Sequence, residues 1–313
     1  MDSAAPDAAT TADEPTTTTE HGTASTDRAT GTATETRPRS RYLDLAHVRL
    51  HYLAAGEETD PPVVLLHGGG LDEARLSWRH LLPALADEHH VLAPDWPGYG
   101  SSGPASRQPS LRYYADVLAE FCDELGLERV SLVGISMGGG IALQFATDHT
   151  DRVERLVLVD SYGLGTSVPG GRLAYWFTRA ERLNRALWWL FSHSDRLGRR
   201  SIRSMVVEGD DDLEADALAA LQRPDVGEAW HAFQRHEVTP TGLRTAFLDR
   251  LPDLDVPTLV VHGERDPLVP VDWAIRAHAM LPDAELFVLP GCGHMPPRER
   301  PESFADRVRA FLG

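Results

Sequence analysis

The chain has 313 residues, of which 47 are acidic and 30 are basic, so its formal net charge at pH 7 is -17. This balance disfavours a nucleic-acid partner, because phosphate backbones are bound by concentrated basic surface. The two cysteines, Cys122 and Cys292, are too few for a disulfide framework and lack metal-ligand spacing. No apolar run approaches the roughly 18 residues that span a bilayer, and the N-terminal residues lack the pattern of a secretory signal. We therefore expect a cytoplasmic protein with no membrane partner.

Every basic residue is an arginine, and no lysine occurs in the chain. A large net negative charge keeps a protein hydrated at high salt, and it also destabilises the compact state by self-repulsion. A genome rich in G and C would explain arginine in place of lysine, but it explains the excess of acid less well. We therefore predict a salt-adapted, halophilic protein.

Residues 1–38 are mostly threonine, alanine and acidic residues, with almost no large apolar side chains. Such a segment cannot bury enough surface to offset the entropy of ordering, so we predict a disordered acidic tail. The sequence does not choose between a solvating segment, an interaction arm and an over-extended gene start. A folded domain is expected over residues 39–313.

The rest of the chain alternates between strand-like and helix-like segments. Alternating apolar residues between Tyr42 and Tyr52 predict paired strands, and the continuous apolar run at 63–66 predicts a strand buried on both faces, as in a parallel sheet. This alternation predicts an α/β fold with a doubly wound, mostly parallel sheet. The further strands are expected at 90–94, 130–134, 155–159, 258–261 and 286–289, and the helices at 78–87, 111–125, 137–148, 271–281 and 302–312.

The alternation is interrupted between about residues 162 and 252, where the sequence predicts several helices. This block carries Trp176, Trp188, Trp189 and Trp230. We expect these tryptophans to serve packing rather than ligand contacts. We interpret the block as a helical lid insertion, since an insert at this point of the chain can lie over the site.

One short motif points to nucleophilic catalysis. A serine hydroxyl is a poor nucleophile unless a base lies next to it and donors stabilise the developing oxyanion. The sequence Gly134-Ile135-Ser136-Met137-Gly138 lies where a predicted strand ends and a predicted helix begins, which is the context of a G-x-S-x-G nucleophile elbow. The tight turn leaves no room for a Cβ atom on either side of the serine. Ser136 is therefore the candidate nucleophile.

Two further candidates each follow a predicted strand, at the sheet edge where open α/β sheets place their sites. His294 is the candidate base, which takes the proton of Ser136 and returns it to the leaving group. Asp266 is the candidate acid that orients the imidazole ring of His294. Asp160 also ends a predicted strand and is an alternative acid.

The chain order Ser136, Asp266, His294, the motif His67-Gly68-Gly69-Gly70 and the segment 95–102 together resemble the α/β-hydrolase superfamily. The resemblance extends from about residue 42 to residue 313. It implies an oxyanion hole formed by the backbone N–H groups of Gly69 and Met137. Met137 follows the nucleophile at a helix N-terminus, where unpaired N–H groups point outward. This chemistry implies no metal ion and no organic cofactor.

The leading hypothesis is a serine hydrolase that cleaves a small carboxylic ester or related acyl compound through an acyl-enzyme. Its partner would be that small-molecule acyl substrate. The triple glycine, the Ser136–Gly139 string and residues 162–165 also resemble carbon-carbon hydrolases that cleave ring-fission products of aromatic compounds. That family tends to have Asn before the nucleophile and Trp after the catalytic histidine, where this chain has Ile135 and Met295.

Two other functions stay open at this point. The string of residues 136–140, SMGGG, resembles cofactor-free perhydrolases and haloperoxidase-like enzymes, whose catalytic residues would look the same. A non-enzymatic ligand-binding module is also possible, because a fold does not determine a function. The sequence does not determine the oligomeric state.

Overall fold

The computed structural model describes residues 37–168, 170–208 and 211–313, which all lie in one compact unit, residues 33–313. The predicted disordered tail, residues 1–38, therefore falls outside the described residues except for its last two positions. Among the described residues, no helix combines the length and the hydrophobicity that a transmembrane span needs.

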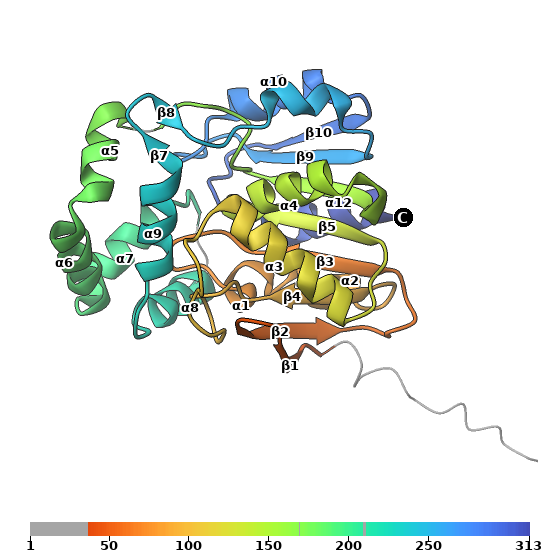
Figure 1. Ribbon diagram of the computed structural model, residues 1–313, viewed down its shortest axis with the longest axis horizontal. Helices are drawn as coiled ribbons and strands as arrows, with labels where there is room; N and C mark the ends of the chain where they lie inside the picture. The colour runs from red at the N-terminus through yellow and green to blue at the C-terminus, as the bar shows by residue number, and fades with distance from the viewer. Residues whose placement is uncertain (1–36, 169, 209–210) are drawn as a thin grey trace, which may run out of the picture. The chain divides into compact units, whose positions relative to one another are not determined.

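An eight-stranded sheet forms the centre of the described unit (Figure 1). Its strand order is β1-β2-β4-β3-β5-β6-β9-β10. β2 runs antiparallel to β1 and β4, and the other neighbouring pairs are parallel. The predicted α/β fold with a doubly wound, mostly parallel sheet is confirmed. The strands are β1 (Arg39–Asp44), β2 (Arg49–Ala55), β3 (Pro62–Leu66), β4 (His90–Pro94), β5 (Val130–Ile135), β6 (Val153–Val159), β9 (Thr258–Gly263) and β10 (Ala284–Leu289).

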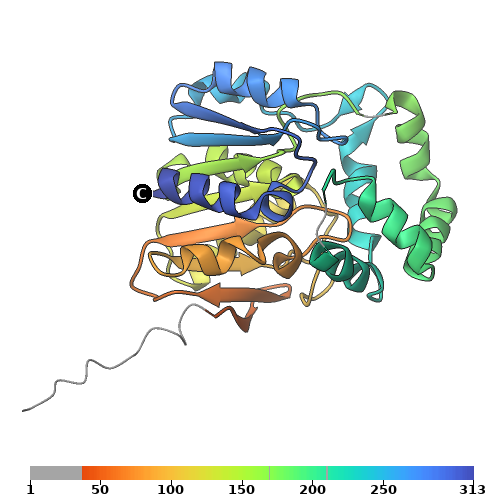
Figure 2. The same cartoon turned by 180° about the vertical axis from the view of Figure 1, so that it is seen from behind.

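Helices cover both faces of the sheet. α3 (Leu111–Glu124), α4 (Met137–Asp148) and α10 (Val271–Met280) lie on the face seen in Figure 1. α2 (Leu81–Leu85) and α12 (Pro301–Leu312) lie on the opposite face, seen in Figure 2, with α1 (Ala74–Trp78) beside them.

Each face of the sheet has its own hydrophobic core. In β3, Val64 and Leu66 pack in the core under α3 and α4, whereas Val63 and Leu65 pack in the core under α2 and α12. Successive side chains of a strand point to opposite faces, so both faces of this strand must be apolar. The prediction of a strand buried on both faces is therefore correct.

Two elements differ from the sequence prediction. Within the helix expected at 78–87 the structure has only α2, and a separate short helix, α1, ends at Trp78, with a break at residues 79–80 between the two. Pro83 explains the break, because its ring clashes with the carbonyl group four residues earlier and it has no N–H to donate. A short helix that the sequence did not predict, α11 (Pro296–Glu299), follows His294 and starts with two prolines.

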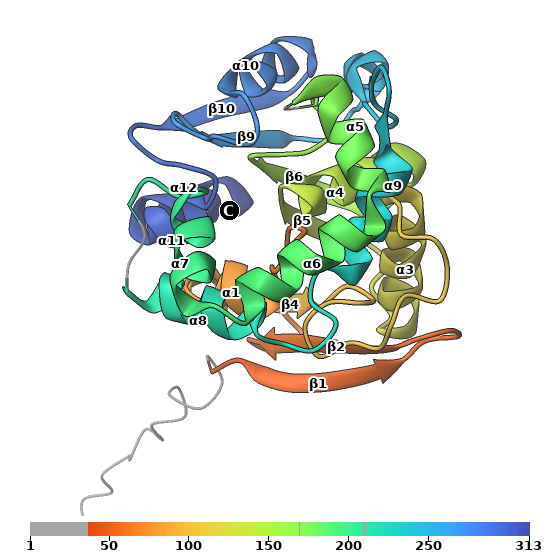
Figure 3. The same cartoon turned by 90° about the vertical axis from the view of Figure 1, so that its left-hand side faces the viewer.

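Between β6 and β9 the described chain forms helices rather than strands of the main sheet. We call α5 to α9 the insertion helices. Figure 1 shows them beyond the ends of the parallel strands, and Figure 3 shows α5 and α6 in front of the other elements. They are α5 (Gly171–Arg179), α6 (Glu181–Ser192), α7 (Asp195–Arg203), α8 (Asp211–Leu221) and α9 (Glu228–Glu237), followed by the short hairpin β7 (Val238–Thr239) and β8 (Gly242–Leu243).

The tryptophans of this block do not all serve packing. Trp188 and Trp230 are half-buried, but Trp176 and Trp189 are exposed. The expectation of packing is wrong for the exposed pair, because they lie on the outer sides of α5 and α6, which the other described elements do not cover.

Candidate active site

Ser136 lies in the turn between β5 and α4, at the carboxyl edge of the sheet. Its φ of 52° falls in the left-handed region that residues other than glycine rarely adopt, so the turn is strained. A Cβ atom on Gly134 would collide with the backbone of Gly138, and one on Gly138 would collide with the carbonyl oxygen of Leu66. The close approach of these backbones explains why glycine flanks the serine on both sides.

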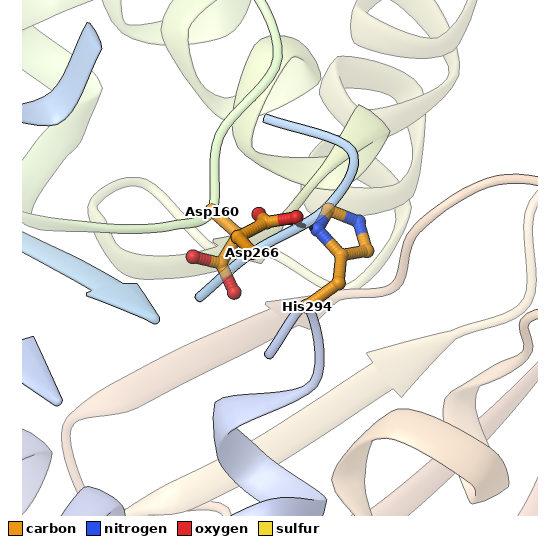
Figure 4. Close-up of side chains that lie close together, drawn as sticks. All are labelled: Asp160, Asp266 and His294. Atoms are coloured by element: carbon orange, nitrogen blue, oxygen red, sulfur yellow. Dashed lines mark hydrogen bonds and ion pairs between the residues drawn. The ribbon is translucent and has the colours of Figure 1, made fainter. Parts of the chain in front are cut away.

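His294 and Asp266 come from loops that follow β10 and β9, and their side chains meet at the same edge (Figure 4). The distance between His294 Nδ1 and Asp266 Oδ2 is 2.7 Å. The other oxygen of Asp266 accepts hydrogen bonds from the backbone N–H groups of Leu268 and Val269. The carboxylate is thus held from both sides, and the proton on Nδ1 leaves Nε2 as the basic nitrogen of the neutral ring.

Asp160, the alternative acid, lies beside this pair and bonds differently. Its Oδ1 accepts a hydrogen bond of 2.9 Å from the backbone N–H of Gly263, and its side chain is fully buried. Burial, together with the neighbouring charge of Asp266, raises the pKa of Asp160 well above its ordinary value. The group at Nδ1 of His294 is therefore Asp266, whereas Asp160 bonds to the backbone N–H of Gly263.

These three side chains also offer ligand atoms within 4.8 Å of one another, as a metal site would. Two of these atoms already face each other in the hydrogen bond between His294 and Asp266. The third side chain, Asp160, accepts its hydrogen bond from the backbone N–H of Gly263.

The surroundings of His294 favour its charged form. Burial alone would lower the pKa of His294, but the hydrogen bond and the charge of Asp266 outweigh it, and Asp160 and Asp72 act in the same direction. The pKa is therefore raised from the ordinary value of 6.5. A stabilised imidazolium is what a general base needs once it has taken a proton.

The glycine loop after β3 is held by a residue that the sequence did not single out, Asp72. Its Oδ2 accepts hydrogen bonds from the backbone N–H of Gly68, at 2.6 Å, and from the hydroxyl group of Ser77, at 2.7 Å. Among the described residues, the N–H groups of Gly69 and Met137 donate to no partner. Both are thus available to a ligand, as an oxyanion hole requires. An acid two residues after a glycine run was the only sequence signal for Asp72.

A second residue that the sequence did not identify, Glu299, supports the loop of His294. Its buried carboxylate accepts hydrogen bonds from the backbone N–H groups of Gly293 and Met295, which flank the histidine, each at 3.0 Å. It also accepts one of 2.8 Å from the N–H of Val207, in the connection between α7 and α8. One carboxylate therefore joins the histidine loop to the insertion. A lone acid within a proline-rich stretch carries no recognisable motif.

A cavity of about 400 Å³ opens over Ser136 and His294. Trp230 of α9 lies against the glycine loop at its floor, where a Cβ atom on Gly69 would collide with the indole ring. None of the described residues that line the cavity is an arginine or a lysine. Its wall is largely apolar, and the insertion helices contribute Phe177, Leu187, Trp188, Phe191, Ile202, Leu213, Ala217 and Leu221, with Asn184, Ser201 and Gln234 as polar members.

The family model of the alpha/beta hydrolase fold matches residues 61–301, which is more than half of the chain. The chain therefore belongs to the α/β-hydrolase fold family, and the resemblance noted in its motifs is confirmed. As a member of this family with the site described above, it is an α/β-fold hydrolase.

Two relatives and one solved structure show which members of the family the chain is similar to. The chain is 31% identical over 281 residues to 2-hydroxy-6-oxo-6-(2'-aminophenyl)hexa-2,4-dienoic acid hydrolase of Metapseudomonas resinovorans, covering 87% of this chain and 90% of the relative. It is 32% identical over 258 residues to 2-hydroxymuconate semialdehyde hydrolase of Pseudomonas sp. strain CF600, covering 80% and 86%. The structure of 2-hydroxy-6-oxo-6-phenylhexa-2,4-dienoate hydrolase from Rhodococcus sp. strain RHA1 matches with a TM-score of 0.74 at 24% identity, over 88% of this chain and 99% of that one, which supports the fold.

Proposed function

We propose that the chain is a serine hydrolase that cleaves a neutral carboxylic ester with an apolar group, through an acyl-enzyme on Ser136. The observation that carries this proposal is the wall of the cavity over Ser136, which is largely apolar and has no arginine or lysine among the described residues. An uncharged ester can enter such a cavity without leaving a charge unpaired.

The proposed reaction uses the groups at the sheet edge. The hydroxyl oxygen of Ser136 attacks the ester carbonyl while Nε2 of His294 takes its proton, and Asp266 holds the ring and balances its new charge. The N–H groups of Gly69 and Met137 stabilise the oxyanion. His294 then protonates the leaving alcohol, and a water molecule, activated by the same histidine, hydrolyses the acyl-enzyme.

The electrostatics of the cavity favour an ester over a carboxylic acid substrate. Asp72 is a buried acid in the cavity lining, and a carboxylate placed there would meet no described cationic side chain except a protonated His294. Ile135 and Met295 also line the cavity, so the two positions that distinguish the chain from the carbon-carbon hydrolases contribute apolar surface.

The second candidate is hydrolysis of a carbon-carbon bond in a ring-fission product. The observation that favours it is the identity of 31% and 32% to hydrolases of a dienoic acid and of a muconate semialdehyde. Asn184 and Gln234 would then hold the polar end of the substrate, since both line the cavity. No observation favours a perhydrolase or a non-enzymatic binding module over these two.

We also propose that the insertion helices act as a lid. Together with the connection between α7 and α8 they supply more than half of the residues that line the cavity, and Glu299 joins that connection to the histidine loop. Substrate selection would thus depend on the insertion and bond cleavage on the sheet edge.

A substrate panel tests the reaction. We expect esters of short or medium acyl chains to be cleaved with kcat/KM at least about tenfold above that of a vinylogous diketone acid, a difference of about 1.4 kcal/mol in transition-state binding. Equal or faster turnover of the diketone acid would replace ester cleavage by carbon-carbon cleavage. No turnover of either class by protein that folds normally would favour a binding module.

A further inference from the structure

The first part of the insertion has a charge opposite to that of the whole chain. Residues 171–203, which form α5, α6 and α7, contain eight arginines and two acidic residues. This is a local excess of six positive charges in a chain whose formal net charge is -17. Two of these arginines, Arg199 and Arg203, are paired with Glu214 of α8, so the positive charge that acts on the surroundings is smaller than this count.

Two of these helices, α5 and α6, carry most of the exposed large apolar side chains among the described residues. Of ten exposed large apolar side chains, six lie on α5 and α6 and are between 40% and 80% exposed. Single exposed apolar residues are common, but a group of this size on two neighbouring helices indicates an interaction surface. The six are Leu173, Trp176 and Phe177 on α5, and Leu183, Trp189 and Leu190 on α6.

Arginines share this outer side of the two helices. Arg172 precedes Trp176 by one helical turn, and Arg185 precedes Trp189 by one turn, so each pair lies on the same helix face. Arg172, Arg182 and Arg185 are exposed and form no ion pair with a described residue. In Figure 3 both helices face the viewer without another element in front of them. We call the six apolar side chains and these three arginines the α5–α6 face.

We propose that the α5–α6 face docks on the surface of an anionic lipid bilayer. Helices that lie in a membrane interface combine exposed Trp, Phe and Leu with arginines whose charged ends reach the lipid phosphates. Each arginine close to an anionic surface strengthens binding by roughly fivefold. The expectation of no membrane partner rests on the lack of an apolar run long enough to span a bilayer. Docking on the bilayer surface needs no such run, so that expectation does not exclude it.

The position of the cavity fits this docking mode. Leu187, Trp188 and Phe191 on the inner side of α6 line the cavity, so one helix has the cavity on one side and the proposed lipid surface on the other. Phe177 is both exposed and part of the cavity lining. An apolar molecule that leaves the bilayer at this face therefore meets the rim of the cavity. The docking itself does not depend on which bond the enzyme cleaves.

A second copy of the chain is the competing occupant of this face. Self-association through a two-fold axis would place the same surface of both copies together, so the unpaired arginines would face one another. Like charges in contact oppose such a dimer, whereas they attract an anionic lipid surface. The charge of the face therefore favours lipid.

Vesicle flotation tests the proposal with the full chain carrying Ser136→Ala, so that no lipid is cleaved during the measurement. Vesicles of phosphatidylcholine containing phosphatidylglycerol are compared with vesicles of phosphatidylcholine alone. We expect binding to the anionic vesicles to be at least about tenfold tighter, and the preference to fall when salt rises from 0.1 to 1 M and the Debye length shortens from about 10 to about 3 Å.

Substitutions in the α5–α6 face test the contributions of its arginines and of its tryptophans separately. Arg172→Gln, Arg182→Gln and Arg185→Gln together should weaken binding to anionic vesicles about a hundredfold, whereas Trp176→Ser with Trp189→Ser should weaken binding to both kinds of vesicle. The matched control is Ile275→Ser with Arg276→Gln on α10, which removes one exposed apolar side chain and one exposed arginine elsewhere. This control should bind like the parent.

Three results would overturn the proposal. They are the absence of a preference for anionic vesicles, equal binding by the face variants and the parent, and a dimer in sedimentation that Trp176→Ser with Trp189→Ser dissociates while no vesicle binds. Thermal melting identifies any variant that fails to fold. Vesicle binding by a chain that cleaves no ester would refute the proposed reaction alone and leave the docking intact.

Discussion

The carboxyl edge of the sheet and the insertion helices border the same cavity, but they are built differently. At the edge, Asp266, Asp72 and Glu299 hold short backbone segments through hydrogen bonds from their carboxylates to backbone N–H groups. In the insertion, apolar side chains form the wall while the outer side of α5 and α6 stays exposed. A rigid edge suits the positioning of reacting groups, and an apolar, partly exposed wall suits the selection of a substrate. The two regions should therefore respond to mutation in different ways.

The largest effect is expected at Ser136. Ser136→Ala should abolish labelling by a fluorophosphonate probe and lower kcat by about a millionfold, because the nucleophile, base and acid act as a unit. Labelling is read by mass spectrometry of the modified peptide. A label on another serine, or unchanged turnover, would remove Ser136 from the mechanism.

The next largest effect distinguishes the two acids. Asp266→Asn should lower kcat about ten-thousandfold, because it removes the acceptor that holds Nδ1 of His294 in the correct tautomer. Asp160→Asn should cost far less, since its bond to the N–H of Gly263 can be kept by an amide oxygen. Steady-state kinetics of the two variants give the ranking, and the reverse order would make Asp160 the orienting acid.

The pH dependence of kcat/KM tests the pairing of His294 with Asp266 in a second way. The base must be neutral to accept the proton of Ser136, and the pKa of His294 lies above its ordinary value of 6.5. We therefore expect kcat/KM to rise about tenfold per pH unit in acid and to level off only above that value. A rate that reaches its plateau well below pH 6 would contradict the stabilised imidazolium.

In the insertion, adjacent tryptophans on α6 provide a matched pair. Trp188→Ala should change the preferred acyl length and alter relative kcat/KM values about tenfold, because Trp188 lines the cavity. Trp189→Ala should leave the preference unchanged, because Trp189 is exposed and does not line the cavity. The measurement is kcat/KM for each ester of the panel. The same shift of preferred acyl length in both variants would show that contact with the cavity wall does not set this preference.

The smallest expected effect is that of salt on thermal stability, which depends on the charge of the whole surface. We expect the thermal unfolding midpoint to rise between low and molar salt, because screening weakens the repulsion within a chain of net charge -17. Calorimetry or circular dichroism measures the midpoint. A midpoint that does not change would refute the inference of a salt-adapted protein.

Local patterns in the sequence predicted most of the sheet and the residues at its edge. The turn that carries Ser136 has a local signature in its flanking glycines, of which Gly134 avoids the backbone of Gly138 and Gly138 avoids that of Leu66 in β3. The helix expected at 78–87 was predicted too long, because the prediction followed the apolar periodicity and ignored Pro83. Asp72 lies only four residues from its partner Gly68, but no motif marked it, and Glu299 could not be predicted because its partners Val207 and Glu208 are about 90 residues away along the chain.

The sequence by itself determined the α/β fold, the family and the order of the candidate nucleophile, acid and base, because these depend on periodicity and on short motifs. Only the tertiary structure decided which acid meets His294, since Asp160 and Asp266 both end strands at one edge and the hydrogen bond to Nδ1 selects between them. It also decided which side of α6 faces the cavity. A helix with apolar residues around most of its circumference does not reveal in its sequence which side will be covered, because burial depends on elements distant along the chain.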